Sequence, residues 1–139
     1  MRKFYLFVIR DDVIKRFNTD FYYLYSVLED IHFLKSEDIV LGFNIFNSIV
    51  KPIDKNYFND YIREHNKDES YMYYNNVHTI NDFYFDEETS MIINNSHIKI
   101  KSNKNIPSFF YNIRNFKNIF VCDFDNRDYF LLDETCISY

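Results

Sequence analysis

Glycine is almost absent from this sequence, which has one among 139 residues, and tryptophan, alanine and glutamine do not occur. Phosphate-binding loops of the P-loop and dinucleotide-binding types need several glycines, because backbone N–H groups must approach the phosphates closely. With Gly42 alone, the chain carries neither loop. None of the serines lies in the Gly-x-Ser-x-Gly elbow that presents a nucleophile in many hydrolases.

Cysteine is scarce as well, with Cys122 inside an apolar run and Cys136 near the C-terminus. We expect both thiols to be unpaired, as in a reduced cytoplasmic protein. The four histidines are scattered, and no His-x-x-x-His or Cys-x-x-Cys pair would bring two zinc ligands onto one face. The sequence therefore predicts neither a metal site nor a cofactor.

An excess of positive charge and long apolar runs are also missing. Lys and Arg total 16 against 21 Asp and Glu, which gives a formal net charge of −5. Sequence-independent binding to phosphates needs clustered positive charge. The apolar run after Met1 ends at Arg10, too soon for a signal peptide, and no later run approaches a membrane span. We expect a cytoplasmic protein without direct nucleic-acid or membrane contact.

Aromatic residues are abundant instead, with 13 Tyr and 16 Phe making up 21% of the chain. Rings must therefore supply much of the core volume, and tyrosines are equally suited to contact surfaces. The richness in Asn, Ile, Lys, Tyr and Phe suggests AT-rich codons, as in the Firmicutes or their phages. The length fits one domain, and we expect residues 1–139 to form it.

Periodicity predicts a strand at residues 3–9, a short helix from Asp11 to Phe17, and a longer helix from a Thr19–Asp20 cap to about Lys35. Residues 38–50 are ambiguous, since their apolar positions fit both a strand and a helix. An amphipathic helix is predicted after Pro52, over about residues 57–67. Further strands are predicted at residues 71–74, 83–85, 91–93, 98–100, 119–124 and 129–132, with a helix after Pro107.

These elements predict an α/β (α+β) fold in a single domain. We expect a mixed or largely antiparallel sheet of about five or six strands, packed with three or four helices. The strand order cannot be derived from the pattern.

The strongest catalytic motif is Asp123-Phe124-Asp125, which follows an apolar strand. Phosphotransferases of the haloacid dehalogenase type present a nucleophile and a general acid beside Mg²⁺ in this way. Those enzymes carry the motif on an early strand and draw further catalytic residues from later elements, whereas here it comes late. A polar turn at a strand end is favoured, and a Mg-dependent phosphotransferase or hydrolase using Asp123 and Asp125 remains the alternative.

An aromatic run at residues 21–25 is the clearest candidate for a contact surface. Proteins that stack bases on aromatic rings combine those rings with a cationic groove, which this composition does not favour. Core packing and protein contact are the better interpretation, because Tyr, Phe and Arg are enriched in protein interfaces. Protein binding without catalysis is thus the function class that the composition favours.

Three segments resemble the SirA family of sporulation inhibitors of DNA replication. The first is F-Y-L-F-V-I-R-D-D-V-I-K-R-F near the N-terminus, and the second is I-V-K-P-I at residues 49–53. The third is I-F-V-C-D-F-D-N-R-D-Y-F-L-L, which starts at residue 119. They occur in the family's order and span almost the whole chain, and none is a catalytic signature.

The resemblance implies a non-enzymatic, monomeric inhibitor that binds the N-terminal domain of the replication initiator DnaA and blocks new rounds of replication during sporulation. The family's partner surface carries over onto Val13 and Phe17 in the first helix, and onto Ile45 and Ser48 before Pro52. Val13 and Ser48 replace larger side chains that the family leads us to expect, which predicts a smaller contact or a changed partner. An interaction module with another target is the alternative.

The orientation of the first helix has two solutions. Val13 and Phe17 are four residues apart and share one face, which either meets the partner or packs on the sheet. If it packs on the sheet, Ile14 points outward.

Overall fold

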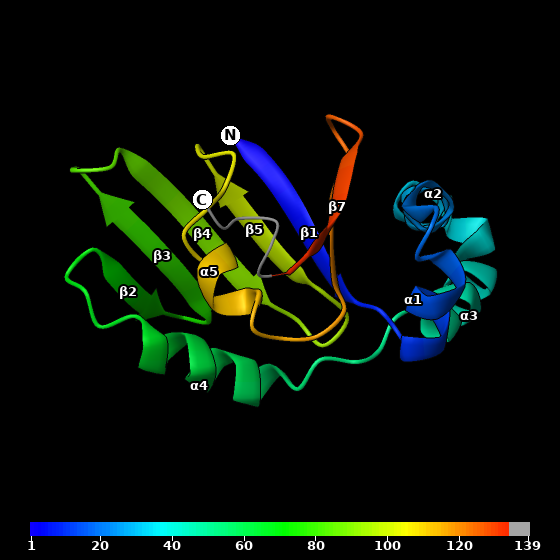
Figure 1. Cartoon of the computed structure of the whole chain (residues 1–139), viewed down its shortest axis with the longest axis horizontal. Coiled ribbons are helices and arrows are strands. Elements are labelled where there is room, and N and C mark those ends of the chain that lie inside the picture. Colours follow the sequence, from blue (N-terminus) through cyan, green and yellow to red (C-terminus); the bar gives the residue numbers. More distant parts are fainter. Residues whose placement is uncertain (134–139) are drawn as a thin grey trace.

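Seven strands form one antiparallel sheet in the computed structural model, which describes residues 1–133 (Figure 1). Along the chain they are β1 (Arg2–Val8), β2 (Tyr71–Tyr74), β3 (Val77–Asp82), β4 (Glu87–Ile93), β5 (Ile98–Ser102), β6 (Ile119–Asp123) and β7 (Asp128–Leu132). Across the sheet the order is β2-β3-β4-β5-β1-β6-β7. Arg2 pairs with Ser102 of β5 and Val8 pairs with Ile119 of β6, so β1 lies between two strands from far along the chain.

Helices lie on both faces of the sheet. They are α1 (Asp11–Phe17), α2 (Phe21–His32), α3 (Ile39–Ile49), α4 (Lys55–His65) and α5 (Phe110–Ile113), with a 3-10 helix η1 (Ser36–Asp38) before α3. Asp20 and Asp54 cap α2 and α4, because their carboxylates accept hydrogen bonds from backbone N–H groups of the first turn. No helix among residues 1–133 is long and apolar enough to cross a membrane.

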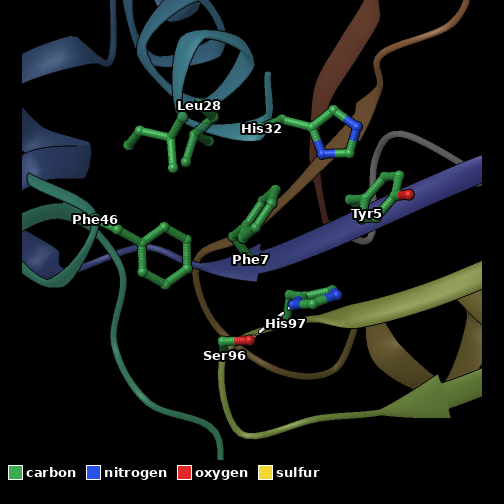
Figure 2. Close-up of a pocket in the computed structure, with 8 residues that line it drawn as sticks. Tyr5, Phe7, Leu28, His32, Phe46, Ser96 and His97 are labelled. Carbon is green, nitrogen blue, oxygen red and sulfur yellow. Dashed lines mark hydrogen bonds between the residues drawn. The ribbon is translucent and has the colours of Figure 1, made fainter. Parts of the chain in front are cut away.

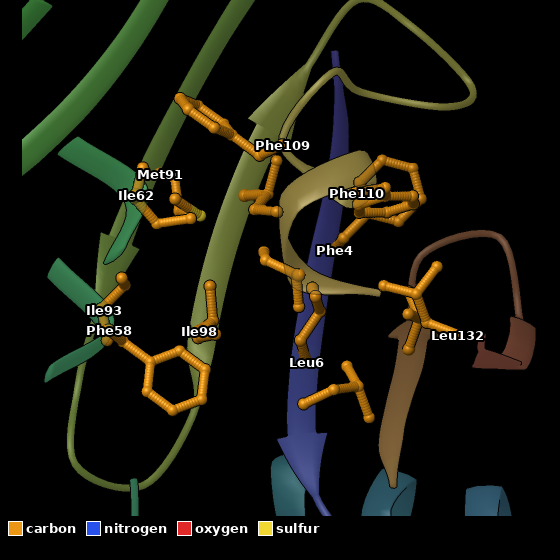
Figure 3. Packing of buried hydrophobic residues seen from close by; sticks show 14 of the residues in the cluster. Phe4, Leu6, Phe58, Ile62, Met91, Ile93, Ile98, Phe109, Phe110 and Leu132 are labelled. Atoms are coloured by element: carbon orange, nitrogen blue, oxygen red, sulfur yellow. The ribbon is translucent and has the colours of Figure 1, made fainter. Parts of the chain in front are cut away.

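Alternate side chains of β1 enter two separate cores, because successive residues of a strand point to opposite faces. Phe4 and Leu6 are buried beneath α4 and α5 (Figure 3), where the rings of Phe4 and Phe110 meet edge to face at 5.2 Å. Phe7 belongs to the second core, which α1 and α2 cover from the other side. The first strand therefore holds both helical layers to the sheet.

The second core covers only part of its sheet face. Its strand residues come from β1, β6 and β7 and the residues that directly follow β1 and β6, while β2 to β5 contribute none. On the same face of β2 to β5, Met72, Tyr74 and Ile92 are exposed. The helices α1 to α3 thus pack against β1, β6 and β7, and Figure 1 shows them grouped on the β7 side of the molecule.

The predicted fold class is confirmed, with one largely antiparallel sheet and helices on it, although the sheet has seven strands rather than five or six. The ambiguous residues 38–50 form α3. The prediction of a strand at residues 83–85 was wrong, since these residues form the turn between β3 and β4, and β3 itself was missed. The helix after Pro107 is a single turn, α5.

Tight turns in this glycine-poor chain use other residues in the left-handed region. Positive φ angles occur at Asn75, Asn76, Asp86, Asn118 and Arg127. Asn and Asp tolerate this conformation better than most residues because their short polar side chains bond to the local backbone. The pair at residues 75 and 76 closes the β2–β3 hairpin, the position where two left-handed residues match the strand twist.

Substitutions at Asp86 measure how much the left-handed conformation lowers the free energy of unfolding. Its φ is 50°, and it is exposed at the end of the β3–β4 turn. We expect Asp86→Ala to lower the free energy of unfolding by about 1–2 kcal/mol, because a Cβ without a polar group is disfavoured there. Asp86→Gly is the control and should show no such loss in urea unfolding. Equal losses in both variants would contradict the backbone explanation.

A buried histidine links α4 to the edge of the sheet. His78 is completely buried, its Nε2 lies 2.7 Å from Oδ1 of Asn59, and its Nδ1 lies 2.7 Å from the Tyr71 hydroxyl. An amide oxygen only accepts, so Nε2 donates and Nδ1 accepts from Tyr71. Burial, with a smaller effect of Arg63, lowers the pKa of His78 to about 4. The neutral imidazole is therefore the form that the fold holds.

The depressed pKa predicts acid sensitivity. Above pH 6.5, the ordinary histidine pKa, His78 is neutral in the folded and unfolded chains. As the pH falls from 6.5 towards 4, only the unfolded chain takes up the proton, so the free energy of unfolding decreases. Between pH 6.5 and 4 we expect the free energy of unfolding to fall by about 1–2 kcal/mol less in His78→Gln than in the unmodified protein. Urea unfolding at several pH values measures this difference. Parallel pH profiles for both proteins would contradict this assignment.

Candidate protein-binding surface

Helix α3 is apolar at most positions, yet only one of its residues is fully buried. That residue is Gly42, where an added Cβ atom would collide with the side chain of Leu34, so the missing side chain permits this close approach. Phe46 and Ile49 pack on the second core one and two turns later. The helix ends where the N–H of Val50 bonds to the carbonyl of Phe46, just before Pro52. Gly42, Phe46 and Ile49 thus form its inward side.

The outward side of α3 exposes a group of large apolar side chains. Val40 is 71% exposed and Phe43 is 65% exposed. Together with the residues before the helix, they form what we call the α3 surface: Phe33, Leu34, Ile39, Val40, Leu41, Phe43 and Ile45. A helix that is apolar all round is normally buried in a core or an interface. Exposed apolar patches larger than a few hundred Å² commonly mark interaction sites in proteins.

Two hollows flank this surface, and both are bordered by Phe43 and Phe46. One, of about 360 Å³, lies between α2 and α3 over Ile31 and Gly42. The other, of about 410 Å³, lies between the end of α3, Pro52 and the β4–β5 turn. Such hollows can receive anchor side chains, and burying a large apolar side chain contributes about 1.5–3 kcal/mol. The α3 surface therefore offers both a ridge and recesses to a partner.

The structure places the two α1 residues of the sequence-based site on the inner side of the helix. Val13 is 4% exposed and belongs to the second core, and Phe17 packs against that core while partly exposed. Ile14 is also partly exposed. In this arrangement Val13 has almost no accessible surface that a partner could contact, while Phe17 keeps some.

The two α3 residues of that site lie at the surface. Ile45 is exposed, and Ser48 is exposed with its hydroxyl donating to the carbonyl of Ile45 at 2.6 Å. Arg10, just before α1, donates from Nε to the carbonyl of Asn47 at 2.9 Å, and its backbone N–H bonds to the carbonyl of Ile49. The start of α1 is thus tied to the end of α3, beside Ser48.

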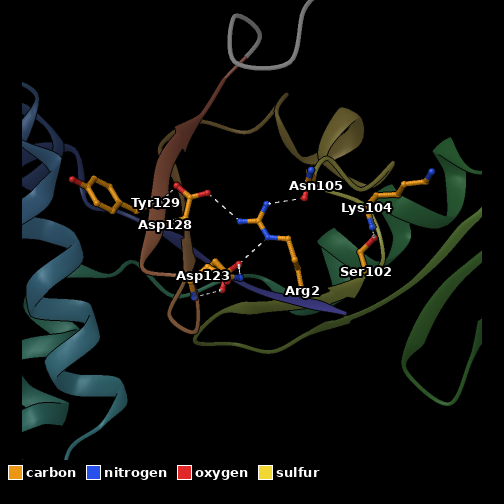
Figure 4. Close-up of polar contacts among 8 residues, drawn as sticks. Arg2, Ser102, Lys104, Asn105, Asp123, Asp128 and Tyr129 are labelled. Carbon is orange, nitrogen blue, oxygen red and sulfur yellow. Dashed lines mark hydrogen bonds and ion pairs between the residues drawn. The ribbon is translucent and has the colours of Figure 1, made fainter.

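In the motif Asp123-Phe124-Asp125, the first carboxylate takes part in a structural ion pair with Arg2. Nε of Arg2 lies 2.8 Å from Oδ2 of Asp123, and Nη2 lies 3.0 Å from Oδ2 of Asp128 (Figure 4). Asn126 donates to Asp123 from both its backbone and its side chain. Burial acts to raise the pKa of Asp123, but the bonds from Asn126 and Arg2 outweigh it and hold the pKa below its usual value. Arg2 thus ties β1 to Asp123 of β6 and to Asp128 of β7.

Other candidate chemistry is limited in the described part of the chain. Asp125 is exposed beyond the strand end. Among residues 1–133, no group of three or more His, Cys, Asp or Glu side chains is placed to hold a metal ion. Cys122 is buried and free, burial raises the pKa of its thiol well above the usual range, and Cys136 lies outside the described residues.

Sequence reasoning missed the first half of the α3 surface. The pattern of residues 39–43 fits both a strand and a helix, so it assigns no inward or outward face to them. The available signal was the spacing of Gly42, Phe46 and Ile49, which identifies the inward side and leaves Val40 and Phe43 outside. The β3–β4 turn was missed as well, although it exposes three consecutive aromatic rings at residues 83–85.

Phe43 is exposed and Val13 is buried, and this contrast gives a test of stability. We expect Phe43→Ser to change the free energy of unfolding by less than about 0.5 kcal/mol, since the ring contributes little to the core. Val13→Ala should lower it by about 1–3 kcal/mol, because it removes two buried methyl groups. Urea unfolding followed by circular dichroism measures both. A larger loss for Phe43→Ser than for Val13→Ala would show that the helices are packed differently.

Comparison with known proteins gives no relative on which this surface could be mapped. No protein-family model matches the sequence, and no curated protein matches it. The resemblance to the SirA family rests on the three segments quoted above, and the assignment of partner residues from it stays a prediction.

Proposed function

We propose that this protein acts without catalysis, by holding a protein partner on the α3 surface. The observation that carries the proposal is the exposure of Val40, Phe43 and their neighbours on a helix whose opposite side is anchored in the core. A rigid helix that presents apolar anchors beside recesses is suited to binding another helix or a groove. Keeping these side chains in water has no structural benefit that the fold reveals.

The partner that the sequence resemblance favours is the N-terminal domain of DnaA. The protein would then inhibit initiation of DNA replication in the cytoplasm of a sporulating bacterium, by covering a surface that DnaA needs. Ile45 and Ser48, which the resemblance selects, are exposed on the same helix as Phe43. Their position supports a contact centred on α3.

The structure shifts the expected balance of contacts within this surface. Val13 is enclosed in the second core, so its role is to support α1 from inside. Ser48 is small, and the rings and branched side chains at residues 39–45 supply the apolar area that Val13 and Ser48 do not. A few central apolar or aromatic side chains commonly dominate binding energy. Phe43 has the largest side chain exposed on α3 and is the expected anchor.

Titration with the purified N-terminal domain of DnaA from the same source tests the proposal. We expect saturable binding in isothermal titration calorimetry, and Phe43→Ser should weaken it at least tenfold, since losing a central ring costs about 1.4 kcal/mol or more. The matched control is Phe85→Ser, which removes an equally exposed ring from the β3–β4 turn. It should bind like the unmodified protein.

Two results would count against this function. If the DnaA domain gives neither heat nor NMR shift changes at high micromolar concentration, DnaA is not the partner. If DnaA binds but Phe85→Ser weakens binding and Phe43→Ser does not, the partner uses the β3–β4 turn and the α3 surface is not the site. A different target for the α3 surface is the remaining interpretation after the first result.

A further inference from the structure

A separate cavity of about 210 Å³ lies behind α3, where the helices α2 and α3 meet β1 and the start of β5 (Figure 2). Its apolar walls include Phe7 from the sheet and Leu28 and Phe46 from the two helices. Its polar lining, which we call the mouth of the cavity, includes His32, at the end of α2, and Tyr5 and His97, from the sheet. The cavity opens at the edge where the helical layer stops and the uncovered half of the sheet begins.

The size and walls of this cavity suit one ring or a branched alkyl group. The rings of Phe7 and Phe46 lie 5.9 Å apart at a steep angle and line its inner end. An apolar cavity of about 150 Å³ already holds a benzene molecule in another protein, so this one has room for a ring with a short substituent. It is small for a ligand with several rings.

Basic groups gather at its mouth around the ring of Tyr5. The ring centroids of His32 and His97 lie 4.9 and 5.7 Å from that of Tyr5, and Nζ of Lys99 lies 5.5 Å from it. No carboxylate lines the cavity. Lys99 takes part in none of the ion pairs found among residues 1–133.

The wider surroundings are also positive on this side. Lys3 and Lys101 share the sheet face of Lys99, because Lys3 pairs with Lys101 and Lys99 lies two residues before it. Two carboxylates face this region: Asp125, which acts on His32, and Glu88, which lies on the same sheet face as Lys101. Like charges on neighbouring strands destabilise a sheet unless an anion compensates them.

One of the two histidines reports the positive charge on this side. Burial, then Lys99, then His32 lower the pKa of His97. Burial also lowers the pKa of His32, where Asp125, which raises it, has a larger effect than Lys99, which lowers it. Both shifts would be partly reversed by a negative charge placed among these groups.

We propose that this cavity binds a small carboxylate that carries one ring-sized apolar group. The apolar group lies between Phe7, Leu28 and Phe46, and the carboxylate lies at the mouth, within reach of Lys99 and His97. This site is independent of the proposed contact with DnaA, since none of the steps above depends on a protein partner. A carboxylate fits better than a neutral ligand because the mouth offers basic groups and no acceptor carboxylate.

The test uses phenylacetate as the probe and phenylacetamide as its neutral counterpart of the same shape, each titrated into the complete chain. In ¹H–¹⁵N NMR spectra we expect saturable shift changes at Phe7, Phe46 and His97, with phenylacetate binding at least fivefold more tightly. The pKa of His97, followed through its ring protons, should rise when phenylacetate is bound. Small ligands of this size bind in about the 0.1–10 mM range, which NMR titration covers.

Two lysine variants separate the site from general surface charge. Lys99→Met should weaken phenylacetate at least fivefold and leave phenylacetamide unchanged within twofold. Lys101→Met removes the same charge from the same strand, but Lys101 pairs with Lys3 rather than with Tyr5, whose ring Lys99 approaches, and this variant should change neither affinity more than twofold. Unchanged shifts elsewhere in the spectrum establish that both variants keep the fold.

Three outcomes overturn the proposal. Without saturable shifts at the cavity residues for phenylacetate, there is no such site. Equal affinities for phenylacetate and phenylacetamide would show that the cavity binds apolar groups without preference for an anion. Equal effects of Lys99→Met and Lys101→Met would assign the preference to the charge of the sheet face rather than to the mouth of the cavity.

Discussion

The alternation of side chains along β1 is the constraint on which the rest of the structure depends. Phe4 and Leu6 are buried under α4 and α5, and Phe7 is buried under the other helical layer, so one strand anchors both cores. A slip of one residue would exchange the two sets between faces, which fixes the register strongly. Because the second layer contacts only β1, β6, β7 and adjoining residues, it ends above β1, and this boundary creates both the cavity and the outward position of α3.

The elements with a clear period could be predicted from the sequence, and those with a misleading composition could not. The strand β1, the capped helix α2 and the last two hairpins follow their apolar patterns. β3 was missed because its inward positions include His78, a polar residue that becomes acceptable only when Asn59 and Tyr71 satisfy both ring nitrogens. The rings at residues 83–85 have strand composition, but Asp82 accepts hydrogen bonds from the backbone of Tyr84 and Phe85 and closes a turn there.

The candidate site was accessible to sequence reasoning only in part. A helix as short as α1 does not reveal from its own residues which side meets the sheet, and the packing of Leu24 and Phe120 in the same core decides that Val13 faces inward. In α3 the polar residues Asn44, Asn47 and Ser48 lie on the exposed side, but none falls within residues 39–43, so no polar residue marks the outer face of the first half of the helix. The helix direction becomes clear only from what it approaches, with Gly42 beside Leu34 and Phe46 beside Phe7.

The place of β1 in the sheet also has a consequence for biosynthesis. β1 is the first strand to leave the ribosome, but its two neighbours, β5 and β6, are completed only at residues 102 and 123. Until then β1 has no neighbouring strand to pair with, and the second core lacks the side chains that β6 and β7 contribute. Pairings this distant in sequence form slowly and leave apolar surface exposed in the nascent chain. The N-terminal half of the sequence thus keeps apolar surface exposed until the C-terminal strands have been made.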